Sequence, residues 1–84
     1  MNYYTIGTDV NLNGEKRPLM IYGRKQLQTS SNMIWDYVAC LYPEGNLGEE
    51  YNIFFQQEEI DRVLYRGYDS ELDLKMQRLL NHAD

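Results

Sequence analysis

The chain has 84 residues, an apolar fraction of 43% and a formal net charge of −5, which predict one water-soluble globular domain over residues 1–84. No run of residues approaches the roughly 20 apolar positions of a membrane-spanning helix, and residues 1–4 (MNYY) lack the basic and apolar parts of a secretory signal, so we expect a cytoplasmic protein without membrane contact. Residues 41–84 carry ten acidic and four basic side chains, an imbalance that opposes binding to a phosphate backbone and disfavours nucleic acid as the main partner.

The first part of the chain contains two strand patterns joined by a turn. Residues 6–12 place apolar side chains mainly on alternate positions, as a half-buried strand does. Asn13 and Gly14 form a pair that tolerates positive φ, and residues 19–22 (LMIY) then resume an apolar run. We expect two antiparallel strands joined by a tight turn.

The middle of the chain combines a polar segment with a strongly apolar one. Residues 26–32 (QLQTSSN) are polar and show no periodicity, which predicts an exposed loop. Residues 34–42 (IWDYVACLY) are rich in aromatic and β-branched side chains, with the odd-numbered positions 35–41 on one face. This pattern predicts the central strand of a sheet.

Further strands are expected after a proline- and glycine-containing turn at residues 43–48 (PEGNLG). Residues 51–55 (YNIFF) read as a strand, and residues 56–61 (QQEEID) are suited to a single 3₁₀ turn. Residues 62–68 (RVLYRGY) read as a fifth strand.

The last segment predicts a helix over residues 70–82. Asp69 or Ser70 is the expected N-cap, and acidic residues follow in the first turn, where they favour the helix dipole. An apolar stripe at offsets of four, seven and eight must cover another surface; it consists of Leu72, Met76, Leu79 and Leu80.

The expected fold is mainly β with a C-terminal α-helix. Five short strands with a 3₁₀ turn before the last are typical of an SH3-like small five-stranded barrel, here over residues 3–68, followed by the helix over 70–82. An open antiparallel sheet with the helix packed across one face, an α+β arrangement, is the alternative.

The sequence offers little for catalysis or for a bound cofactor. With one histidine, His82, and one cysteine, Cys40, the usual zinc ligand sets cannot form within one chain. Cys40 lies in an apolar run and reads as a buried structural thiol. The acidic loop 44–50 does not match the spacing of a calcium-binding loop, and no phosphate-binding glycine motif occurs. We therefore expect no catalytic, cofactor or metal site.

Eight tyrosines are the unusual feature of the composition, because tyrosine combines a large rigid ring with a polar tip and is enriched at interfaces. Tyr22, Tyr37 and Tyr65 lie within apolar runs and are expected to be structural. The tyrosines that flank turns, together with polar neighbours in the acidic loop, are the predicted partner-binding residues: Tyr42, Glu44, Asn46, Tyr51 and Tyr68.

Several short motifs are similar to those of an uncharacterised family of small domains of unknown function from Gram-positive bacteria. They are YPEGN at residues 42–46, YNIFF at 51–55, EEID at 58–61 and GY at 67–68, and the resemblance covers nearly the whole chain except the final helix. The chain departs from the family pattern at Gln56 and Gln57, where Asn-His is usual, which removes any role for a histidine there.

The resemblance implies a function in protein binding. Family members are associated with type VII secretion loci and their LXG-type toxins, so the resemblance implies a cytoplasmic accessory protein or chaperone that binds a toxin or a secretion component. The alternative is a nucleic-acid-binding small β-barrel whose exposed aromatic side chains stack on bases. A small enzyme with an active site shared across a dimer is a third hypothesis, and an open sheet edge would also allow a homodimer.

Overall fold

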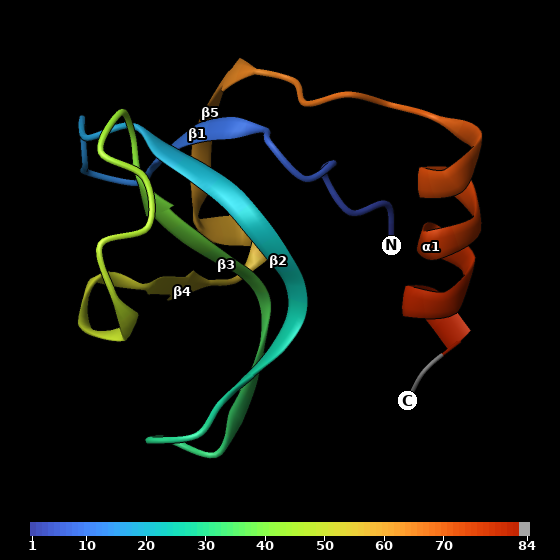
Figure 1. Cartoon of the computed structure of the whole chain (residues 1–84), viewed down its shortest axis with the longest axis horizontal. Coiled ribbons are helices and arrows are strands. Elements are labelled where there is room, and N and C mark those ends of the chain that lie inside the picture. Colours follow the sequence, from blue (N-terminus) through green and yellow to red (C-terminus); the bar gives the residue numbers. More distant parts are fainter. Residues whose placement is uncertain (83–84) are drawn as a thin grey trace.

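The computed structural model describes residues 1–82 as a five-stranded antiparallel sheet with one α-helix at its side (Figure 1). The elements in chain order are β1 (Asp9–Leu12), β2 (Leu19–Gln28), β3 (Met33–Leu41), the 3₁₀ helix η1 (Glu49–Tyr51), β4 (Ile53–Phe55), the 3₁₀ helix η2 (Gln57–Glu59), β5 (Ile60–Tyr65) and α1 (Glu71–His82). The mainly-β fold with a C-terminal helix is thereby confirmed.

The sheet is curled but open. Its strand order is β4-β3-β2-β1-β5, and no pairing joins β4 to β5 among the described residues. Five strands laid flat would separate the two edges by about 19 Å, yet only residues 56–59, most of them in a compact 3₁₀ turn, connect these edge strands. The sheet therefore bends, and of the two predicted arrangements the open sheet is present, whereas the SH3-like barrel is not closed.

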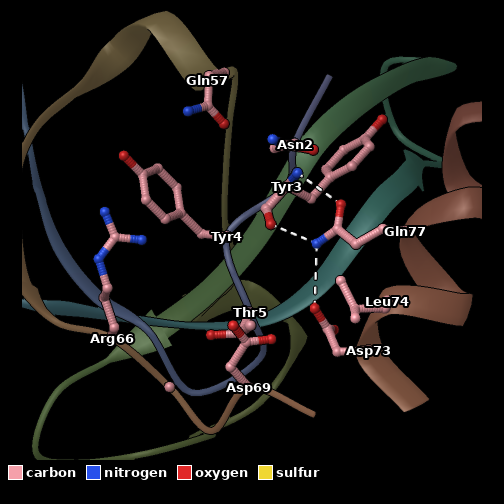
Figure 2. Close-up of a pocket in the computed structure, with 11 residues that line it drawn as sticks. Asn2, Tyr3, Tyr4, Thr5, Gln57, Arg66, Asp69, Asp73, Leu74 and Gln77 are labelled. Carbon is pink, nitrogen blue, oxygen red and sulfur yellow. Dashed lines mark hydrogen bonds between the residues drawn. The ribbon is translucent and has the colours of Figure 1, made fainter. Parts of the chain in front are cut away.

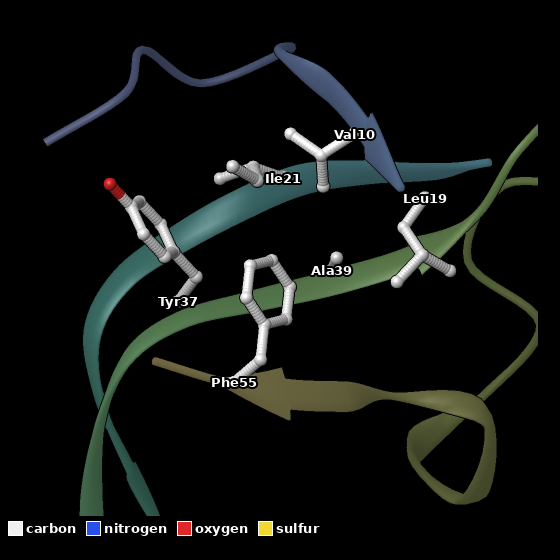
Figure 3. Close-up of a cluster of buried hydrophobic side chains, with 6 residues drawn as sticks. All are labelled: Val10, Leu19, Ile21, Tyr37, Ala39 and Phe55. Atoms are coloured by element: carbon white, nitrogen blue, oxygen red, sulfur yellow. The ribbon is translucent and has the colours of Figure 1, made fainter. Parts of the chain in front are cut away.

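The core lies on one face of this curled sheet (Figure 3). It is built from alternate residues of the strands, because successive side chains of a strand point to opposite faces of the sheet. Its buried members are Val10, Leu19, Ile21, Tyr37, Ala39 and Phe55. Tyr37 and Phe55 are fully buried, and their ring centroids lie 5.4 Å apart in a stacked arrangement. Positions 37 and 39, which were predicted to lie on one face of the strand, both lie in this core.

The predicted loop at residues 26–32 is wrong at its start. β2 continues to Gln28, and residues 26–28 pair with residues 33–35 of β3. The polar side chains that suggested a loop stabilise the end of this hairpin, because Gln28 Oε1 accepts hydrogen bonds from Trp35 Nε1 at 3.0 Å and from Ser31 Oγ at 2.6 Å. Leu27 and Ile34, which are paired across the two strands, are both exposed there.

The helix docks through polar contacts and not through its predicted apolar stripe. Only Leu80 of that stripe is buried, whereas Leu72, Met76 and Leu79 are exposed. The amino-terminal segment lies between the sheet and α1 (Figure 1), and the Gln77 amide forms hydrogen bonds with both the N–H and the C=O of Tyr3, at 2.8 and 2.5 Å. The helix begins after Ser70, whose Oγ accepts a hydrogen bond from the N–H of Asp73.

One acidic residue in the sheet makes stability depend on pH. Asp9 Oδ1 is buried and accepts no hydrogen bond from any described residue, and burial raises the pKa of this carboxyl above its ordinary value of 3.8. The folded chain therefore binds the proton more tightly than the unfolded chain, and the free energy of unfolding falls as pH rises from 3.8 through the raised value.

Replacing Asp9 with asparagine removes this charge. Asp9→Asn is expected to raise the free energy of unfolding by about 1 kcal/mol at pH 7 and to leave it nearly unchanged at pH 3, as measured by urea denaturation. Asp61→Asn, at an exposed position of β5, is the control. An equal gain for Asp9→Asn at both pH values would contradict the explanation.

Candidate functional site

Four of the five predicted partner-binding residues lie in one segment, residues 42–52, which connects β3 to β4. Tyr42 follows the end of β3, and Tyr51 ends η1 just before β4; both side chains are exposed. Because residues 39 and 53 are paired in the antiparallel ladder, the two ends of this segment lie at the same end of the sheet. The structure thus gathers Tyr42, Glu44, Asn46 and Tyr51 on one connection.

The two polar members of this group are partly engaged within the chain. Glu44 forms an ion pair with Arg17, and hydrogen bonding to its own backbone and to Arg17 lowers the pKa of its carboxyl. Asn46 Oδ1 accepts a hydrogen bond from the N–H of Gly48 at 3.2 Å. Both polar side chains therefore have a partner within the chain, and the exposed rings of Tyr42 and Tyr51 are the larger contact surfaces.

Tyr68 lies apart from the other four residues. The N–H of Tyr42 donates to the C=O of Pro18, just before β2, whereas the N–H of Gly67 donates to Thr8 Oγ1, just before β1. These positions are at opposite ends of the β1–β2 pair, because Val10 pairs with Leu19. Tyr68, which is 86% exposed, belongs to the linker that runs from β5 towards α1 (Figure 1).

A cleft of about 690 Å³ opens on the sheet face opposite the core, and we call it the outer cleft. Phe54 contributes apolar surface to it, together with Tyr22. Val38, which pairs with Phe54 across β3 and β4, also lines the cleft but is almost fully buried. The Tyr22 hydroxyl donates a hydrogen bond to Asn52 Oδ1, which ties the end of the 42–52 connection to this face. The remaining lining residues are Gln26, Leu27, Gln28, Thr29, Ser30, Glu49 and Glu50.

The outer cleft is acidic. Glu49 and Glu50 line it, no Lys, Arg or His side chain does, and neither carboxylate has an ion pair within residues 1–82. Burial raises the pKa of Tyr22, and the nearby Glu49 carboxylate adds to this rise. A cleft lined by both apolar and carboxylate side chains suits an apolar side chain that is flanked by cationic groups.

A second cavity, which we call the helix pocket, lies between the amino-terminal segment, the linker after β5 and α1 (Figure 2). Its volume is about 470 Å³. The residues that line it are Asn2, Tyr3, Tyr4, Thr5, Gln57, Arg66, Gly67, Asp69, Asp73, Leu74 and Gln77.

An ion pair and hydrogen bonds hold the walls of the helix pocket. Asp73 pairs with Arg24 of β2 at 2.8 Å, and both side chains are largely buried. The Gln77 amide also donates to Asp73 at 3.2 Å. The sequence patterns predicted neither cavity, although the apolar residues at positions 38 and 54, on the face opposite the core, were a usable signal for the outer cleft.

Other predicted features have clear positions. Cys40 is a buried free thiol, as predicted, and burial raises its pKa. Tyr37 is in the core, but Tyr65, which was expected to be structural, is 65% exposed because it lies on an edge strand. No helix in the described part of the chain is long and apolar enough to cross a membrane.

The chain matches a known family model. The family model described as Domain of unknown function (DUF4176) matches residues 3–76. The chain belongs to this family. The resemblance of the sequence motifs to an uncharacterised family of small domains is confirmed. The DUF4176 match extends further than expected, into the first half of α1.

The DUF4176 match contains the whole outer cleft and all five strands. It also contains the helix pocket except for Asn2 and Gln77. No curated protein and no solved structure gives a significant match to the chain.

Proposed function

We propose that this DUF4176 chain is a non-enzymatic, protein-binding accessory domain that acts in the cytoplasm. The contact surface is the outer cleft together with Tyr42 and Tyr51 on the adjoining connection. The observation that carries the proposal is the composition of the cleft, which Phe54 and Tyr22 line together with Glu49 and Glu50, two carboxylates that have no ion pair within residues 1–82. Central apolar and aromatic contacts with charged groups at the rim are the usual composition of protein interfaces.

The partner segment that fits this surface carries an apolar side chain and nearby lysine or arginine. The acidic second half of the chain increases the rate of association with such a segment through long-range attraction. The resemblance to a family associated with type VII secretion extends the proposal. It suggests that the partner is an LXG-type toxin or a secretion component, and that the domain acts as a chaperone for a basic or aggregation-prone region.

A nucleic-acid-binding function has weaker support. Exposed tyrosines can stack on bases, but Glu49 and Glu50 at the outer cleft repel phosphate groups. Co-purification of nucleic acid in place of a protein would favour this alternative.

The double variant Tyr42→Ala/Tyr51→Ala tests the proposed surface. The tagged chain is purified from its native host, co-purifying proteins are identified, and the dissociation constant of the identified partner is then measured with purified components. Loss of both rings is expected to weaken binding by at least about tenfold, because interface tyrosines contribute large buried areas. Tyr65→Ala, at an exposed position outside this surface, is the matched control.

Folding of every variant is checked by circular dichroism. A folded double variant that binds the identified partner as tightly as the unchanged chain would show that this surface is not the interface. The pair Glu49→Gln/Glu50→Gln tests the electrostatic component, since it should weaken binding at low salt more than at high salt.

A further inference from the structure

A buried hydrogen-bond chain determines how one amide faces the helix pocket. The hydroxyl oxygen of Tyr37 accepts a hydrogen bond from the N–H of Tyr4 at 2.9 Å, so its own proton is free to be donated to Gln57 Oε1. Burial raises the pKa of Tyr37 to about 12, and the phenol keeps this proton at neutral pH. With its oxygen occupied, Gln57 presents its NH₂ group as a donor to the pocket that it lines.

Two more donors lie on the same side of the helix pocket. Figure 2 shows the Arg66 guanidinium and the Tyr4 hydroxyl on the side of Gln57, opposite Asp73, Leu74 and Gln77. The Arg66 guanidinium carbon lies 5.3 Å from the centre of the Tyr4 ring, which positions the cation. Within residues 1–82, Arg66 has no ion pair and the Tyr4 hydroxyl has no hydrogen bond.

The side of the pocket formed by α1 carries no unpaired acidic group that would repel an anion, and it offers apolar surface. Asp73 is neutralised by Arg24, and Leu74 contributes exposed apolar surface to the pocket. Asp69 is the other acidic group that lines the cavity, and it forms no ion pair with Arg66. An anion would therefore lie at the Gln57 side, away from Asp69 (Figure 2).

We propose that the helix pocket binds the carboxylate group of a ligand, with Arg66, the Gln57 amide and the Tyr4 hydroxyl as its three donors. A planar guanidinium binds a carboxylate through two parallel hydrogen bonds, and neutral donors complete the set. The apolar part of the ligand packs against Leu74 and Tyr3. This site is separate from the outer cleft and does not depend on the protein-binding function.

The test uses small carboxylates of defined structure. Acetyl-alanyl-leucine with a free carboxylate is titrated into the full ¹⁵N-labelled chain, with its carboxamide as the matched ligand. The carboxylate is expected to shift the amide signals of Tyr4, Gln57 and Gly67 with a dissociation constant of about 0.1 to 10 mM, and the carboxamide to bind at least about tenfold more weakly. Acetyl-glutamate methylamide, whose only carboxylate is on the side chain, distinguishes a side-chain carboxylate from a chain terminus.

Two substitutions of donor residues complete the test. Arg66→Gln removes the cation and Gln57→Glu replaces the donor with an acceptor, and each is expected to weaken carboxylate binding by about tenfold. Arg78→Gln makes the same charge change on α1 outside the pocket and should have no effect. Failure of both carboxylates to shift the pocket signals, equal binding of the carboxamide, or unchanged binding in folded Arg66→Gln would each overturn the proposal.

Discussion

Replacing Tyr37 with alanine is expected to lower the free energy of unfolding by about 3 to 5 kcal/mol. The side chain is fully buried, and its ring stacks on Phe55 and meets the edge of Tyr3 with centroids 5.9 Å apart. A domain of this size has a total stability of only about 5 to 15 kcal/mol, so this one substitution should remove a large share of it. Urea denaturation followed by the fluorescence of Trp35, the one tryptophan, measures the loss.

Tyr37→Phe separates the contribution of the ring to stability from that of the hydroxyl group. It keeps the packing but leaves the N–H of Tyr4 and the oxygen of Gln57 without their partner, and we expect a loss of about 1 to 2 kcal/mol. If Tyr37→Phe were as unstable as Tyr37→Ala, the hydrogen-bond chain and not ring packing would be the main contribution of this residue.

The strands were predictable because their pattern is local. Positions 35–41 alternate between the two faces of β3, and Tyr37 and Ala39 lie in the core as the period requires. The 3₁₀ turn was predictable for the same reason, and its Glu59 carboxylate accepts a hydrogen bond from the N–H of Gln56. Such signals need only neighbouring residues.

The arrangement of the elements was less predictable because it depends on distant contacts. A closed barrel and an open sheet have the same alternation, and only pairing between β4 and β5 distinguishes them. The exposure of Tyr65 follows from its place on an edge strand, which a local pattern does not reveal. The predicted partner-binding residues were grouped by composition, and only the structure separates Tyr68 from the 42–52 connection.

The docking of α1 could not be predicted from the spacing of its apolar residues. Its apolar stripe predicted burial, but the described contacts of the helix with β2 and the amino-terminal segment are mainly polar. Asp73 appeared in the sequence only as an acidic residue favourable to the helix dipole. In the structure it pairs with Arg24, with 12% and 6% of the two side chains exposed.

Arg24→Met is therefore expected to release α1 and to lower the free energy of unfolding by about 3 kcal/mol, because it leaves the Asp73 carboxylate buried without a cation. Urea denaturation measures the loss. Hydrogen exchange should show faster exchange of the α1 amides than of those in β2 and β3, since the sheet core does not depend on this pair.

Two further variants determine whether the loss comes from the buried charge. Arg17→Met removes the cation of the surface pair with Glu44, in which 45% and 38% of the side chains are exposed, and should cost less than about 1 kcal/mol. Arg24→Met/Asp73→Leu buries neither charge and should recover part of the stability lost in Arg24→Met. If Arg24→Met were no less stable than Arg17→Met, the Arg24–Asp73 pair would not hold the helix, and the hydrogen bonds between Gln77 and Tyr3 would be its main attachment.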